Sequence, residues 1–195
     1  MDFLERYTKR WKKGEVLHEF QQDRALRSKL ECYVHKQRKA LSCWFSELMI
    51  ICLDLGTKTG FAAYSRHTGI VSGVKDFSTK RTEGGGMRYL RFRRWLDTLK
   101  DGIEEVYYEE VKRHAGTQAA HVYGAFQGVL MSWCDEYSIP YSSVPVGTIK
   151  KSWTGKGNSS KDEMIKEAIK RGFSPETHDE ADALALINYV LKKVD

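Results

Sequence analysis

The sequence predicts a mixed α/β fold from Met49 onward, with a five-stranded sheet flanked by helices. Three short apolar runs at 49–54, 59–65 and 69–77 are separated by turn residues, as expected for a three-strand meander. Longer segments with helically spaced apolar residues then alternate with two further strand-like runs. Strands first and alternation later indicate one mixed sheet with helices on its faces.

The elements after the meander follow in a regular order. A helix is expected over 86–100, where apolar residues recur at helical spacing. VYYEEV at 106–111 is typical of a fourth strand, and IPYSSVPV at 139–146 of a fifth. The remaining helices are expected at 117–136, 160–171 and 178–192.

Residues 1–48 differ in composition from the rest of the chain. They contain one Gly, no Pro, and 11 Lys or Arg against 7 Asp or Glu. Aromatic residues every fourth position from Phe3 to Trp11 predict a short helix, and a looser apolar stripe predicts a second one. We therefore predict a helical N-terminal extension at 1–48 before a domain at 49–195. The extension is expected to pack as a helical hairpin; DNA contact, dimerisation, or sequence upstream of the working domain are the alternatives.

The composition favours a globular, intracellular protein. The 195 residues are 41% hydrophobic and 30% charged, with a formal net charge of +6 that permits nucleic-acid binding without proving it. The four cysteines form no C-x-x-C pair, which disfavours structural zinc and a disulfide framework. No apolar stretch reaches membrane-spanning length, and the charged N-terminus lacks a signal-peptide core. The cytoplasm, without membrane association, is the expected location.

Carboxylates at three separate places are the candidate chemical groups. Asp54 ends the first strand, where ligands bind in open α/β sheets. The fourth strand offers Glu109 and Glu110 on opposite faces, so only one can join Asp54. Asp179 and Asp182 share one face in the first turn of the last helix. Taken alone, that pair could merely complement the helix dipole. Converging carboxylates are instead what two magnesium ions require, and such ions roughly 4 Å apart support phosphodiester cleavage.

In these motifs the chain resembles the RuvC family of Holliday-junction resolvases, within the RNase H-like nuclease superfamily. LDLGTKTGFA resembles the family's opening strands and matches its first catalytic acid to Asp54; YYEEV matches the second to Glu109. HDEADALALI resembles the family's closing motif and matches the last two to Asp179 and Asp182. Some family members carry His at the first position of that pair, so His178, one residue away, is a candidate to assist metal binding.

The segment VGTIKKSWTGKGNSSKDEM resembles the family's stretch with two functional lysines. They correspond to Lys150 and Lys161, which the resemblance places near the scissile phosphate, where ammonium groups hold phosphate or stabilise developing charge. Solvated lysines are the alternative for both. Lys151 and Lys156 are candidate peripheral phosphate contacts.

One segment departs from the family pattern. Where the family often carries an aromatic wedge after the catalytic Glu, this chain has Lys112, Arg113 and His114. Opening of a junction by stacking is therefore not expected here. Lys112 and Arg113 instead form a basic tip that could approach DNA phosphates.

The resemblance implies a crossover junction endodeoxyribonuclease. It would resolve four-way DNA junctions by paired nicks, as a homodimer, with two Mg²⁺ ions per active site, for which Mn²⁺ could substitute, and without a nucleotide cofactor. The family association also suggests a virus of bacteria as the source, in which case the location is the host cytoplasm.

Three other functions are weighed against this one. D-x-G-T also occurs in the phosphate loop of actin-like and sugar-kinase ATPases, but too few residues follow Asp54 for the second domain that this architecture needs. A nuclease of the same fold could act on flaps, other branched DNA or RNA–DNA hybrids, because the fold does not fix the substrate. A junction-binding protein without catalysis is the third alternative, and the retained acids argue against it.

Overall fold

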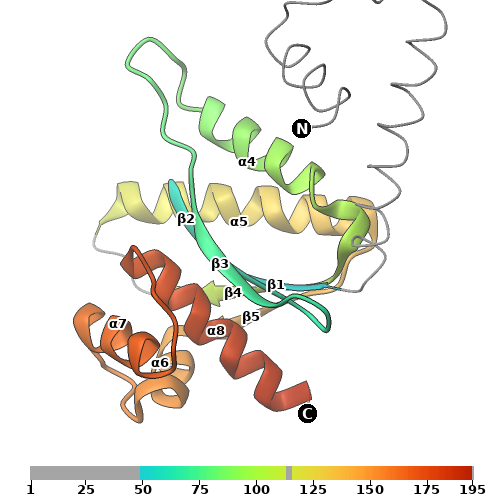
Figure 1. Ribbon diagram of the computed structural model, residues 1–195. Coiled ribbons are helices and arrows are strands. Elements are labelled where there is room, and N and C mark those ends of the chain that lie inside the picture. Colours follow the sequence, from blue (N-terminus) through green and yellow to red (C-terminus); the bar gives the residue numbers. More distant parts are fainter. Residues whose placement is uncertain (1–48, 113–115, 195) are drawn as a thin grey trace, which may run out of the picture. The chain divides into compact units, whose positions relative to one another are not determined.

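The computed structural model describes residues 49–112 and 116–194, and the helices predicted within 1–48 lie outside the described residues. Five strands form one sheet in the order β3-β2-β1-β4-β5 (Figure 1). The strands are β1 (Met49–Asp54), β2 (Lys58–Ser65), β3 (Gly69–Asp76), β4 (Ile103–Glu110) and β5 (Tyr141–Pro145). The mixed five-stranded sheet predicted from the sequence is confirmed.

The pairing of the strands places three carboxyl ends at one edge of the sheet. β1, β2 and β3 form an antiparallel meander, in which Asp54 pairs with Gly60. β4 runs parallel to β1, and β5 runs parallel to β4. β1, β4 and β5 therefore end on the same side, where ligands bind in sheets of this kind.

Helices cover both faces of the sheet. The first group contains α4 (Met87–Asp97) and α5 (Thr117–Tyr137), which pack against each other. The second contains α6 (Val146–Thr154), α7 (Lys161–Lys170) and α8 (His178–Val194); α8 lies across β1 and β2. None of the helices in the described segments is both long and apolar enough to cross a membrane.

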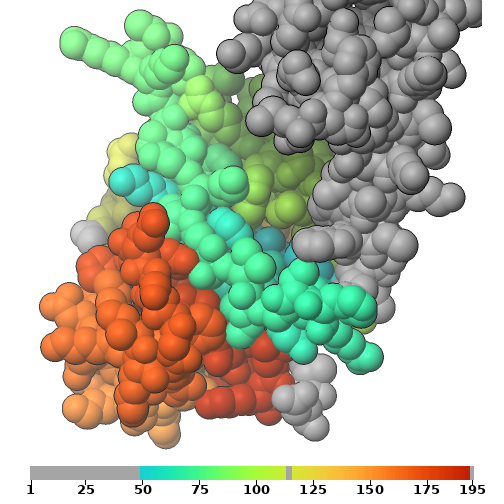
Figure 2. Space-filling view, in the orientation of Figure 1, coloured from blue at the N-terminus to red at the C-terminus, as the bar shows by residue number. Residues whose placement is uncertain are grey.

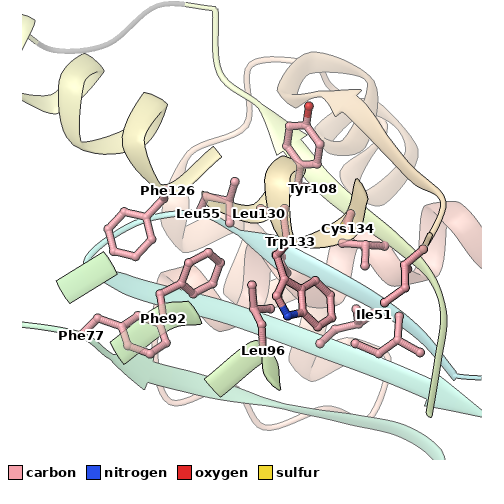
Figure 3. Close-up of a cluster of buried hydrophobic side chains, with 14 of the residues drawn as sticks. Ile51, Leu55, Phe77, Phe92, Leu96, Tyr108, Phe126, Leu130, Trp133 and Cys134 are labelled. Atoms are coloured by element: carbon pink, nitrogen blue, oxygen red, sulfur yellow. The ribbon is translucent and has the colours of Figure 1, made fainter. Parts of the chain in front are cut away.

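Alternation along β1 divides the core between the two faces. Ile51 and Leu53 belong to the cluster beneath α4 and α5, and Cys52 belongs to the cluster beneath α8. Figure 3 shows the first cluster, where the Phe92 ring centroid lies 5.1 Å from that of Phe126. Because neighbouring strand residues point to opposite faces, the position of each residue along β1 decides which layer its side chain stabilises.

One helix of the second group was not predicted. The expected fifth strand extended to 146, and no helix was expected between 146 and 160, whereas β5 ends at Pro145 and α6 follows at once. The β-branched residues at its start favour a strand locally. The helix buries Ile149 and Trp153, four residues apart, against α8's side of the sheet. Tertiary packing therefore overrides local propensity in this segment.

Candidate active site

Asp54 and Glu109 point to the same face of the sheet. Cys52, two residues before Asp54, and Tyr107, two residues before Glu109, both pack in the cluster on the α8 side. The period of two then directs Asp54 and Glu109 to that side as well. Glu110 faces the opposite layer and lies 3.7 Å from Lys112 in an exposed ion pair. The choice of Glu109 over Glu110 therefore agrees with the geometry.

The first turn of α8 brings two further acids to the same edge. Asp179 and Asp182 both lie close enough to raise the pKa of Asp54. The helix begins where the Thr177 hydroxyl accepts a hydrogen bond from the backbone N–H of Glu180 at 3.2 Å. A side-chain oxygen in this position satisfies one of the free N–H groups at the helix start. The sequence spacing predicted that Asp179 and Asp182 share one face of α8. The tertiary fold then brings Asp54 close to both of them.

Gly60 permits this close approach of helix and sheet. A Cβ atom at Gly60 would lie 1.9 Å from the backbone oxygen of Asp179. Because that neighbour is backbone, only glycine allows α8 to sit this close to β2. Gly60 is the partner of Asp54 in the β1–β2 ladder. Its role was not identified from the sequence, although it is the second glycine of the LDLGTKTGFA motif.

Glu180 anchors the same turn and was also missed. Its side chain is 8% exposed, and it accepts hydrogen bonds from Ser72 Oγ at 2.6 Å and from the backbone N–H of Glu176 at 2.9 Å. Ser72 lies on β3, so this carboxylate joins α8 to the edge of the meander. In Figure 2 the red and orange surface of the C-terminal helices meets the teal surface of β3. The T-x-x-E spacing before the apolar run is the signal that could have indicated a structural role for Glu180.

The clustered carboxyl groups hold their protons tightly. Burial, followed by the negative charges of Glu109 and Asp182, raises the pKa of Asp54 well above its ordinary value. Burial and the charge of Asp182 likewise raise the pKa of Glu109 to about 7. The two carboxyl groups share a hydrogen bond, which raises the pKa of Asp54 and lowers that of Glu109. Burial also raises the pKa of Asp182.

The donor set fits a hard divalent cation, although its side chains are not closed around one. Within 49–112 and 116–194, no three His, Cys, Asp or Glu residues stand close enough to hold one ion. Asp54 and Glu109 are instead joined by a hydrogen bond, which requires that one of them carries a proton. A cation would replace that proton and relieve the repulsion between oxygens. Nearby, the buried Nδ1 atom of His178 has no hydrogen-bond partner.

Two lysines lie beside the acids. Lys150 on α6 lowers the pKa values of both Glu109 and Asp182, opposing the effect of burial. Its ammonium group donates a 2.8 Å hydrogen bond to the backbone oxygen of Ser159. Lys161, the first residue of α7, lowers the pKa of Asp182. Both lysines therefore act on the charges of the carboxylates, and their expected contact with a scissile phosphate stays a prediction.

The four weaker candidate DNA contacts lie elsewhere. Lys112 is exposed at the end of β4, and Arg113 lies outside the described residues. Lys151 is exposed on α6, beside a hollow that is also lined by Tyr189. Lys156 is exposed, 3.9 Å from Glu163. The assignment of these residues as peripheral DNA contacts stays a prediction.

Curated relatives are similar to this chain over about half of its length. The crossover junction endodeoxyribonuclease RuvC of Anaeromyxobacter sp. strain Fw109-5 is 34% identical over 102 residues, which are 49% of this chain and 50% of the relative. RuvC of Anaeromyxobacter dehalogenans strain 2CP-1 is 32% identical over 101 residues, 47% of this chain and 55% of the relative. The chain thus spans about half the length of the curated relatives it matches. No model of a known protein family matches it.

Solved structures are similar over a larger part. Thermus thermophilus RuvC in complex with a Holliday junction substrate matches with a TM-score of 0.59 and 22% identity, over 71% of this chain and 89% of that one. A further Thermus thermophilus RuvC structure matches with a TM-score of 0.57 and 22% identity, over 71% of this chain and 90% of that one. At this identity the likeness concerns the fold. The chain is therefore similar in sequence to RuvC over about half of its length, and it has the RNase H-like fold of RuvC.

Proposed function

We propose that the chain is an endodeoxyribonuclease that nicks four-way DNA junctions, using magnesium bound by Asp54, Glu109, Asp179 and Asp182. One observation carries the proposal. Carboxyl groups from β1, β4 and α8 lie so close together that their charges raise one another's pKa values. Their ionisation therefore destabilises the folded state. Groups with strongly shifted pKa values, gathered from separate elements, are typical of catalytic sites.

The chain's own side chains have distinct roles in this proposal. The four acids provide oxygen ligands, which suit two Mg²⁺ ions and also Mn²⁺. Bound ions of this kind activate water and stabilise the leaving oxygen of a phosphodiester. Lys150 and Lys161 hold the scissile phosphate beside the acids, since both already act on the charge of Asp182. His178 supports the acids from the start of α8.

The junction substrate rests on the relatives. The curated relatives are named crossover junction endodeoxyribonucleases, and one Thermus thermophilus structure contains a Holliday junction. We infer the same substrate here, and a homodimer, because two symmetric nicks are needed to separate a junction into two duplexes. Exposed Lys112, Lys151 and Lys156, together with Arg113, would contact phosphates further from the cut.

Cleavage of a labelled four-way junction tests this function directly. The purified chain is incubated with junction, flap, fork, RNA–DNA hybrid and linear duplex, with magnesium or with chelator. We expect paired, magnesium-dependent nicks in the junction only. Equal cutting of flaps or hybrids would indicate a broader nuclease of this fold, and tight binding without cutting would indicate an architectural protein.

Glu109→Gln and Glu110→Gln form a matched pair for the metal assignment. The two residues are adjacent on β4 but face opposite layers, so the same change tests one site and one control. We expect Glu109→Gln to abolish nicking while junction binding persists, and Glu110→Gln to nick like the wild type. Asp54→Asn should behave as Glu109→Gln does. Nicking by either site variant at the wild-type rate would exclude its carboxylate from the metal site.

A further inference from the structure

The turn after α6 holds the Lys150 side chain through a backbone oxygen. The Lys150 ammonium group donates to the oxygen of Ser159 at 2.8 Å, across nine positions of the chain. Ser159 is 3% exposed, and it immediately precedes Ser160, which caps α7. The position of this oxygen is therefore a property of the turn and not of the helix that carries Lys150.

Two hydroxyl groups tie this turn to α6. Thr154 Oγ1 and Ser159 Oγ lie 2.5 Å apart. Thr154 Oγ1 lies 2.9 Å from the backbone oxygen of Lys150, and Ser159 Oγ lies 2.9 Å from that of Lys156. Each hydroxyl has one hydrogen, so one donates to the other, which in turn donates to a carbonyl. In the arrangement where Ser159 donates to Thr154, which in turn donates to the Lys150 oxygen, these bonds connect the backbone of Lys150 to the residue whose carbonyl binds its side chain.

The backbone of the turn also lies close to α6 on its other side. A Cβ atom at Gly157 would lie 3.2 Å from the backbone oxygen of Gly147, which lies near the start of α6. The turn is thus tied to α6 by the paired hydroxyls of Thr154 and Ser159, and it lies close to α6 at Gly157. A carbonyl held in this way can act as a rigid acceptor for an ammonium group.

We propose that Ser159, paired with Thr154, is a positioning residue that directs the Lys150 ammonium group toward Glu109 and Asp182. This inference rests on the proposed function in one respect, the contact of Lys150 with the scissile phosphate. Without the Ser159 hydroxyl the turn loses its link to Thr154, and its carbonyl no longer fixes the lysine. Lys150 then remains charged but samples several directions, so the phosphate is held less often in the reactive position.

Amine labelling tests the positioning without any nuclease activity. The full chain, wild type or Ser159→Ala, is treated with limiting acetylating reagent, and mass spectrometry follows Lys150 and its exposed neighbour Lys151. We expect Lys150 to react several-fold more slowly than Lys151 in the wild type, and its rate to rise several-fold in Ser159→Ala while Lys151 is unchanged. Ser143→Ala, an exposed serine on β5, is the control and should change neither rate. An unchanged Lys150 rate in Ser159→Ala overturns the proposal.

Single-turnover nicking separates positioning from general damage. At saturating junction and magnesium, we expect Ser159→Ala to nick about ten- to a hundred-fold more slowly, with junction affinity within two-fold of wild type. In a Lys150→Gln background the same substitution should cause no further loss, because its effect passes through Lys150. Equal losses in both backgrounds overturn the proposal. If the wild type does not nick, the proposed function fails, and the labelling result still decides the positioning.

A second substitution pair guards against a folding defect at Ser159. Thr154→Ser keeps the hydroxyl, and Thr154→Val removes it with little change in volume. We expect the Val variant to reproduce the labelling and nicking defects of Ser159→Ala and the Ser variant to match the wild type. Identical behaviour of the two variants contradicts the role of the hydroxyl pair.

Discussion

Glu109 has an unusual electrostatic environment for a residue near the carboxyl end of an inner strand. Its side chain is 7% exposed, and its pKa is raised to about 7 from an ordinary value of 4.5 by burial and by Asp182. In the absence of a cation, ionisation of this group works against folding. The same arrangement favours binding of a cation that replaces the proton. Such a site lowers the free energy of unfolding of the metal-free protein but provides ligands for catalysis.

The free energy of unfolding should therefore depend on pH in the metal-free chain. The folded pKa of Glu109 lies above its ordinary value, so the folded state binds more protons between about pH 4.5 and about pH 7. Stability is fully present below that window and falls as pH rises through it, by an amount on the order of 3 kcal/mol. Urea unfolding with chelator at pH 5 to 8 measures this slope.

Glu109→Gln isolates the contribution of this one group. The variant has no carboxylate to ionise, so its stability should vary less with pH than that of the wild type and exceed it at pH 8. Saturating magnesium should also flatten the slope of the wild type. Identical slopes for wild type and variant would contradict the electrostatic account.

At the scale of the elements, the junction between β2 and α8 controls the site. The backbone of Asp179 contacts Gly60, and Glu180 joins the same turn to Ser72 on β3. Asp182 lies one turn further along the helix. The position of two of the four acids thus depends on how closely a helix approaches a strand.

Gly60→Ala should displace the first turn of α8. The new methyl group would lie 1.9 Å from the Asp179 oxygen, and overpacking of this kind costs about 1–3 kcal/mol. We expect lower thermal stability and a larger loss of nicking than the loss of stability explains, because Asp179 and Asp182 move away from Asp54. Thermal unfolding and junction cleavage measure the two effects.

Gly73→Ala is the matched control on the neighbouring strand. Its methyl group would meet the ring edge of Phe61 at 3.0 Å, a side chain that can shift. We expect a small loss of stability and wild-type nicking. Equal nicking defects in the two variants would show that the contact with Asp179 is not special.

The elements also mark the limit of sequence reasoning. The meander, β4, α5 and α8 follow from apolar periodicity, and α7 additionally from its capping box at Ser160. α6 could not be predicted in this way, because its start favours a strand and its burial depends on residues distant in sequence. The motif resemblance predicted a role for Lys150, which stays a prediction, and its contact with Ser159 could not be foreseen because it requires the turn that follows α6.

At the scale of the molecule, the positive and negative charges are concentrated in different places. The chain carries a formal net charge of +6, yet its candidate site gathers four acids. The positive charge must therefore lie mainly outside that cluster. In the proposed nuclease, the acids would bind cations while lysines outside the cluster would contact phosphates further from the cut.

Junction binding should weaken steeply with salt. Each neutralised phosphate releases counterions, which contributes about −0.9 to the slope of log affinity against log salt concentration. Lys151→Gln and Lys156→Gln should each reduce the steepness of the slope by about one if these residues contact phosphate. Fluorescence anisotropy with a labelled junction and chelator measures it. A salt-insensitive affinity would refute phosphate-based binding.

The sequence by itself determined the strands, most helices and the acids that each element carries, because periodicity and spacing are local properties of the chain. It also showed that only one of Glu109 and Glu110 can lie beside Asp54, since neighbouring residues on a strand face opposite ways. The tertiary structure alone decided which acids approach one another, how the Gly60 backbone admits α8, and where the Lys150 ammonium is held. Those features depend on contacts between residues far apart in sequence, and burial and charge act only once the chain has brought such residues together.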